Sequence, residues 1–219
     1  MNFDITDEQR RTQQAAREFA ERVLVPKADD VDRLGKIEPE TIAQLGEAGW
    51  LGKTIPEAHG GADGDFVGLV LVLEELAAAC ANTAALVATN VVVARALLKY
   101  GTEEQKNKLL PLIARGQTTV AHAGVEPFEM LALTRHEDGT CELNGKLAAM
   151  DVFGLPGHVL VFGYDDSAQT ARAFVLPYTA QNLTATVLPG TLGKRGMGLA
   201  TLPFDRVRVP QAMMIGEEG

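Results

Sequence analysis

The spacing of apolar residues along the chain changes between residues 115 and 151. Before this stretch, apolar side chains recur with the period of an α-helix, about 3.6 residues per turn. After it, they recur at every second residue, which is typical of strands that bury one face. The pattern predicts an α+β fold, with a helix bundle over residues 1–116 followed by a β domain over residues 117–219.

Several predicted helices have recognisable ends. Thr6 and Thr102 each stand three residues before a glutamine, which is the spacing of a capping box at a helix start. Pro26 marks the end of the first helix or a kink in it, and Pro39 suits the first turn of the second. The predicted helices cover about residues 6–26, 39–49, 66–81, 83–100 and 102–113.

The third and fourth of these helices are strongly apolar. The third is expected to be an amphipathic helix with Glu74 and Glu75, and its broad buried side is formed by Val67, Val70, Leu71, Leu73 and Leu76. The fourth is apolar almost all round, so we expect it in the middle of the bundle. Asn90 and Arg95 interrupt its apolar run, and a membrane span needs a longer uninterrupted one.

The second half of the chain has the residue pattern of a β domain, with short predicted strands separated by turns. Asp138-Gly139 is a strong hairpin signal and predicts a type I′ turn, which requires two residues that accept positive φ. Because the connections are short, the strands are expected to pair mostly antiparallel, as a sandwich or open barrel. The predicted strands cover residues 118–123, 131–134, 141–143, 159–164, 171–176, 183–188 and 202–209.

Composition narrows the class of protein. An apolar content of 46% and a charged content of 22% are typical of a soluble globular protein. The net charge of −9 and the absence of a basic stripe argue against a nucleic-acid surface. Cys80 and Cys141 lie in different halves and have no metal-ligand spacing, and Cys80 is expected to be a reduced buried thiol, so neither a disulfide framework nor a metal site is predicted. No secretory signal is recognisable, and the expected location is the cytoplasm.

A series of short motifs, in a fixed order along essentially the whole chain, resembles the acyl-CoA dehydrogenase family. Each motif alone is weak, but the ordered set is specific. The motifs are Gly49-Trp50-Leu51-Gly52, Ile55-Pro56-Glu57, Gly60-Gly61, Glu74-Glu75-Leu76-Ala77, Gly101-Thr102-Glu103-Glu104-Gln105-Lys106, Glu126-Pro127, Leu143-Asn144-Gly145-Lys146, Leu192-Gly193, Arg195-Gly196, Val207-Arg208-Val209-Pro210 and Ile215-Gly216-Glu217-Glu218-Gly219.

The resemblance implies an N-terminal helical domain, a middle β domain and, in ordinary members, a second helical domain after the point where this sequence ends. That further domain carries the family's catalytic glutamate, which removes a proton α to the thioester. No residue of this sequence is therefore assigned a catalytic role. Glu126 is a carboxylate beside a proline, but in the family it belongs to the frame of the flavin loop and is not the base.

The motifs that contact the flavin in the family are altered here. Where the family has Thr-Glu-Pro followed by small residues, this sequence has Val125 before Glu126, so one hydroxyl donor is replaced by a methyl group. Ala149 replaces an aromatic ring and Asp151 replaces a hydroxyl. A carboxylate facing a flavin that accepts hydride disfavours its reduction. FAD is therefore expected at a site shared with a partner, or not bound by this chain alone.

Three further residues have two interpretations each. Lys194 and Arg195, among glycines, are candidate contacts to a phosphate or the tail of coenzyme A, and the alternative is a solvated turn. His122 is expected to be a hydrogen-bonded structural histidine, with a ligand contact as the alternative.

Three functions follow from the resemblance. In the first, the chain is a non-catalytic subunit that pairs with a complete, FAD-carrying acyl-CoA dehydrogenase. In the second, it is one half of a split dehydrogenase that a separate C-terminal chain completes. In the third, it binds an acyl-CoA or acyl-carrier-protein thioester without redox chemistry. The altered flavin motifs favour the first, although a fold does not fix a function.

Overall fold

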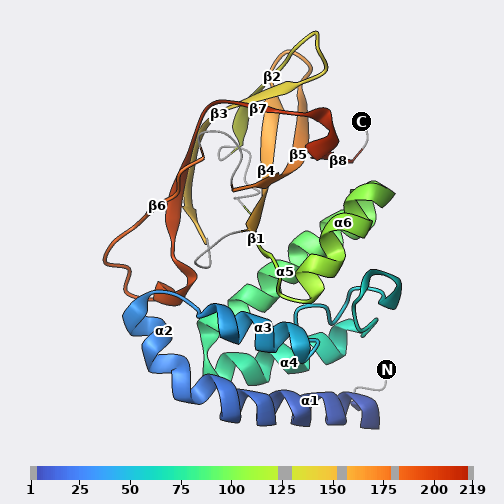
Figure 1. Cartoon of the computed structure of the whole chain (residues 1–219), viewed down its shortest axis with the longest axis vertical. Coiled ribbons are helices and arrows are strands. Elements are labelled where there is room, and N and C mark those ends of the chain that lie inside the picture. Colours follow the sequence, from blue (N-terminus) through green and yellow to red (C-terminus); the bar gives the residue numbers. More distant parts are fainter. Residues whose placement is uncertain (1–3, 123–129, 152–156, 179–182, 217–219) are drawn as a thin grey trace.

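The computed structural model describes residues 4–122, 130–151, 157–178 and 183–216, and it places a β-sheet part against a helical part (Figure 1). The helices are α1 (Asp7–Phe19), α2 (Ala28–Leu34), α3 (Pro39–Glu47), α4 (Phe66–Ala79), α5 (Ala81–Tyr100) and α6 (Glu103–Ala114). The helices end at Ala114 and the first strand begins at Thr119, where the period of the sequence changes. The expected α+β fold is confirmed.

The predicted helix starts are present with their caps. Both capping boxes form: Thr6 accepts a hydrogen bond from the Gln9 amide, and Thr102 accepts one from the Gln105 amide. Pro39 occupies the first turn of α3, and the α-helical hydrogen bonding of α1 ends before Pro26. A π-helical turn at Ala20–Leu24 and a 3₁₀ turn at Val25–Lys27 follow α1 and lead into α2. Helix α2 was not predicted from the sequence.

Helix α5 is the core helix of the helical part, as its apolar sequence predicts. It is long and apolar enough to cross a membrane by length and composition alone, but more than half of that apolar stretch is buried inside the protein. Leu86 and Val87 pack with α1 and α4, whereas Val93 and Leu97 pack against the sheet. The helix thus joins the core of the helical part to the sheet.

Helix α4 follows the prediction in part: Leu76 is buried as expected, and Leu71 and Leu73 are half-buried. Its buried residues include Leu69, Val72 and Leu76, which face α1 and α5. Val67 and Val70, which were expected on the buried side, are 50% and 59% exposed. Apolar residues surround the helix almost evenly, so its sequence does not determine which side is buried.

The strands form an 8-stranded mixed sheet (Figure 1), and its buried apolar residues form a core cluster of their own. They are β1 (Thr119–His122), β2 (Leu131–Arg135), β3 (Cys141–Met150), β4 (Gly157–Asp165), β5 (Thr170–Pro177), β6 (Thr186–Val187), β7 (Ala200–Val209) and β8 (Met214–Ile215). The path is β6-β7-β3-β2-β4-β5-β8, and β1 pairs with β4. Most pairs are antiparallel as expected, but β1 and β2 both run parallel to β4. Strand β6 is shorter than predicted, and β8 was not predicted.

The hairpin between β2 and β3 confirms the signal at Asp138-Gly139, but the predicted turn type is wrong. Only Gly139 has positive φ, at 80°, whereas a type I′ turn needs it at both central residues. The amide of Gly139 donates to the His136 carbonyl, and the Asp138 carboxylate accepts from the amide and hydroxyl of Thr140. The aspartate side chain therefore caps the turn.

Candidate functional site

The four residues at the altered flavin motifs are only partly described. Val125 and Glu126 lie outside the described residues. The backbone of Ala149 belongs to β3, and its side chain is outside the description. Asp151 follows the last residue of β3 and is half-buried.

The topology places Asp151 and Tyr178 at the same end of the sheet. Strand β3 ends at Met150, opposite Ala200 at the start of β7. Tyr178 follows the end of β5, and its amide donates to the carbonyl of Gly157, the first residue of β4, at 2.9 Å. Because β3 runs antiparallel to β2, and β2 runs parallel to β4, β3 ends where β4 begins. Both side chains therefore belong to one rim of the sheet.

Three polar atoms near this rim are buried without a partner. The Oδ1 atom of Asp151, the Nδ1 atom of His122 and the Oη atom of Tyr178 have no hydrogen-bond partner in the described part of the chain. Tyr178 is 9% exposed. His122 ends β1; the expectation that it is a hydrogen-bonded structural histidine stays a prediction, because only Nδ1 is shown to have no partner in the described part of the chain. A buried polar atom that loses its hydration and gains no hydrogen-bond partner costs about 1–3 kcal/mol.

The charges at this rim interact. Burial raises the pKa of the Asp151 carboxyl, and the nearby Lys194 and His122 lower it in part. Burial, and then the negative charge of Asp151, raise the pKa of the Tyr178 phenol above its ordinary value. Tyr178 therefore remains a neutral hydrogen-bond donor, and the sequence alone did not single it out.

The described residues fit a redox-active flavin poorly. A flavin that accepts hydride gains negative charge, and an ionised Asp151 in a poorly hydrated position would oppose that gain. Lys194 offsets part of this charge, but its side chain is exposed to solvent, where such interactions are weak. The rim is suited to holding a neutral polar group through the Tyr178 hydroxyl.

The two candidate substrate-binding residues have different surroundings. Arg195 is used in the fold: Nη1 lies 3.1 Å from Oδ2 of Asp32 in α2, and Nε donates to the Thr191 carbonyl at 3.1 Å. Gly196 lies so close to Val31 of α2 that a side chain there would collide with it. Lys194 is exposed, has a φ of 57° and lies near enough to Asp151 to affect its pKa.

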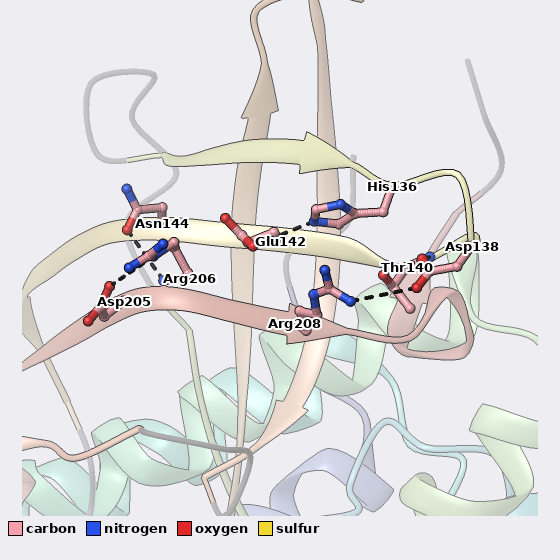
Figure 2. A network of polar contacts seen from close by, with 8 residues as sticks. All are labelled: His136, Asp138, Thr140, Glu142, Asn144, Asp205, Arg206 and Arg208. Carbon is pink, nitrogen blue, oxygen red and sulfur yellow. Dashed lines mark hydrogen bonds and ion pairs between the residues drawn. The ribbon is translucent and has the colours of Figure 1, made fainter.

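A separate polar network lies on the outer face of β3 and β7 (Figure 2). His136 Nε2 lies 3.5 Å from Glu142 Oε2, and Arg208 Nη1 lies 3.7 Å from Asp138 Oδ2. The Asn144 side chain accepts from the amide of Arg206, whose φ is 49°, where the pairing of β3 with β7 shifts register. These contacts hold the hairpin and the irregular pairing in place. No cluster of metal-ligating side chains occurs among the residues that the structure describes.

The chain is similar in sequence to acyl-CoA dehydrogenases. The family model "Acyl-CoA dehydrogenase, N-terminal domain" matches residues 6–117. The chain is 30% identical over 233 residues to a short-chain specific acyl-CoA dehydrogenase of Megasphaera elsdenii, covering 100% of this chain and 61% of the relative. It is 27% identical over 229 residues to the short-chain specific acyl-CoA dehydrogenase of Clostridium acetobutylicum, covering 100% and 60%. It thus spans about three fifths of the length of these relatives.

Solved structures agree with this likeness. The butyryl-CoA dehydrogenase of Megasphaera elsdenii superposes with a TM-score of 0.90 at 30% identity, covering 100% of this chain and 61% of that one. The glutaryl-CoA dehydrogenase of Mycobacterium smegmatis, in complex with FADH2, superposes with a TM-score of 0.89 at 23% identity, covering 98% and 57%. The second comparison supports the fold alone.

Proposed function

Because this chain belongs to the acyl-CoA dehydrogenase family, we propose that it is a subunit without catalytic activity of its own. It pairs with a complete, FAD-carrying chain of the same family, which α,β-dehydrogenates an acyl thioester carried on coenzyme A or an acyl-carrier protein. The flavin binds in the partner or at a site that both chains share.

The observation that carries this proposal is the environment of Asp151. Its carboxyl is half-buried, and its Oδ1 atom has no hydrogen-bond partner among the described residues. A hydride-accepting site needs donors aimed at the charge that develops, and a carboxylate has the opposite polarity. The position therefore supports a structural role for this chain more than a redox role.

Pairing is supported by the outward side of α4. Phe66, Val67 and Val70 are 51%, 50% and 59% exposed, on a helix that is apolar almost all round. Helices of this kind are usually covered on every side, and contiguous exposed apolar residues mark interaction surfaces. A second chain of the family is the occupant that we propose for this surface.

Native mass spectrometry of the protein purified from its own host, without added flavin, tests the proposal. We expect a complex with a longer member of the family that carries fewer FAD molecules than it has subunits. A homo-oligomer with one FAD per chain would overturn the proposal, because this chain would then hold its own flavin despite Asp151. A monomer without flavin or partner would overturn it as well.

A further inference from the structure

A cavity of about 330 Å³ lies where the start of α6 meets the sheet. Its lining includes Lys108 and Leu109 of α6, His158 of β4, Val175 of β5 and Met213, which stands just before β8. No residue of this cavity was predicted from the sequence to bind a ligand. The cavity is therefore a second candidate site, apart from the rim of the sheet.

A hydrogen-bonded side chain holds two walls of the cavity together. The amide nitrogen of Gln105 in α6 donates to the Ala212 carbonyl at 2.8 Å and to the Met214 carbonyl at 2.9 Å. Its Oε1 atom accepts from the backbone amide of Thr102 at 2.9 Å. One side chain thus joins the first turn of α6 to the chain around the start of β8. The cavity is preformed, as ligand sites usually are.

His158 uses one ring nitrogen in the fold and leaves the other for a ligand. Its Nδ1 atom lies 3.0 Å from Oγ1 of Thr118, and this hydroxyl donates to the Thr119 carbonyl at 3.3 Å. Because the hydroxyl proton is used there, the hydroxyl accepts from Nδ1–H, and Nε2 carries the lone pair of the ring. Nε2 has no hydrogen-bond partner in the described part of the chain, so it can accept from a donor in the cavity.

Lys108 supplies the positive charge of the cavity. Burial, and then the charge of Lys108, lower the pKa of the His158 imidazole, so the ring is neutral at neutral pH and keeps its lone pair. Glu104, one helical turn before Lys108, is an exposed acidic residue of the lining. Its charge opposes the entry of a dianion, so the cavity suits a monoanion such as a carboxylate better than a phosphate.

The rest of the lining is largely apolar. Val175 and Leu109 are 6% and 8% exposed, and Met213 and Pro177 are half-buried. Methionine side chains adapt readily to the shape of a ligand. A cavity of this size, with an apolar lining and few polar groups, suits a small molecule.

We propose that this cavity binds a small organic acid whose carboxylate stands next to an O–H or N–H donor on a compact apolar body. The carboxylate lies beside the Lys108 ammonium, and the donor bonds to Nε2 of His158. The apolar body packs on Leu109, Val175 and Met213. A 2-hydroxy acid and an N-acyl amino acid both carry this arrangement of groups. The site goes beyond the proposed function, because it requires neither a flavin nor a partner chain.

Isothermal titration calorimetry on the protein purified from its own host tests the site. The probes are 2-hydroxy-4-methylpentanoate and N-acetylleucine, and we expect at least one to bind with a Kd of about 1 mM or tighter. The tighter probe identifies the donor as O–H or N–H. The acid 4-methylpentanoate has the carboxylate and the apolar body but no donor, so it should bind about tenfold more weakly.

Three calorimetric results would overturn the proposal. They are no binding of either probe at millimolar concentration, equal binding of 4-methylpentanoate, and tighter binding of inorganic phosphate than of both probes.

A matched pair of lysine substitutions locates the bound acid. Lys108→Gln should weaken binding by about tenfold, because it removes the charge that faces the carboxylate. Lys146→Gln is the control, because Lys146 is exposed on β3 and does not line the cavity. It should leave the Kd unchanged, and thermal unfolding verifies that both variants are folded. Equal affinities in the two variants would place the acid elsewhere and overturn the assignment.

Nitrogen NMR of the His158 ring is the second measurement. We expect the free protein to show a neutral ring protonated at Nδ1, and the Nε2 signal to move upfield when the acid binds. A ring protonated at Nε2 instead, or an Nε2 signal that the acid does not change, would overturn the proposal. The proposed function would remain standing in either case, because these measurements do not depend on flavin content or on a partner.

Discussion

Replacing Tyr178 with phenylalanine should stabilise the protein. The ring is 9% exposed within the sheet interior, and its hydroxyl has no hydrogen-bond partner among the described residues. The substitution keeps the packed ring and removes only the group that has lost its hydration. A buried hydroxyl in this position costs about 1–3 kcal/mol, and the variant should recover much of that.

The magnitude can be measured by thermal and urea unfolding. For a chain of this length, 1 kcal/mol corresponds to a change in Tm of about 2–4 °C, so an increase of roughly 2–10 °C is expected. The midpoint in urea should rise without a change in the m-value, because the surface exposed on unfolding is nearly the same.

The pH dependence provides an independent measurement of the same group. The folded-state pKa of Tyr178 is raised, so the neutral phenol is favoured in the folded protein. Its contribution to stability is fully present below the unfolded pKa of about 10 and is lost as the pH rises above that value. The difference in stability between Tyr178→Phe and the wild type should therefore widen above about pH 10.

Tyr164 is the matched control for this experiment. Its hydroxyl donates to the Gln169 side chain at 3.3 Å, in an exposed position. Tyr164→Phe should therefore be neutral or slightly destabilising. If Tyr178→Phe were destabilising by 1 kcal/mol or more, the hydroxyl would have a partner and the reasoning about the rim would be refuted.

Three other substitutions test separate parts of the structure. Asp151→Asn should raise Tm at neutral pH and have no effect below about pH 4. The pKa of the Asp151 carboxyl is raised in the folded protein, so its ionised form opposes folding. An equal change in Tm at both pH values would contradict this. Glu75→Gln should cost about 1–3 kcal/mol at pH 7 in urea unfolding, since Glu75 accepts hydrogen bonds at 2.9 and 2.7 Å from Arg17. Because the pKa of Glu75 is lowered, this cost should disappear as the pH falls below about 4, and a constant cost would count against the ion pair. Gly46→Ala should destabilise the folded protein by about 1–3 kcal/mol, because the added methyl group would collide with the Arg115 carbonyl. This loss outweighs the better helix propensity of alanine. A gain in Tm would show that α3 can shift.

Local sequence signals predicted the helix starts reliably. The capping boxes at Thr6 and Thr102 and the proline at position 39 depend on residues within one turn of each other, so their effect does not require the rest of the chain. The hairpin at Asp138-Gly139 was predicted for the same reason. Its turn type was wrong because the Asp138 side chain bonds Thr140, which the dipeptide alone does not indicate.

Signals that depend on distant residues were less informative. The apolar residues of α4 surround the helix, and packing against α1 and α5 decided that Leu69 is buried and Val70 exposed. The alternation of β1 and β2 predicted strands, but their parallel pairing with β4 depends on chain connections between elements. Likewise, Arg195 has the chemistry of a phosphate contact, yet the fold places it beside Asp32.

The amino-acid sequence thus specifies the family, the α+β class and most element positions, because these depend on short-range spacing and on motifs in order. The grouping of Asp151, Tyr178 and His122 near one rim arises only on folding, since they stand at or just after the ends of three strands that are separated along the chain. The cavity beside Lys108 likewise requires α6 to meet β4 and β5, which are separated from it along the chain. Both features depend on how layers pack, and no local pattern contains that information.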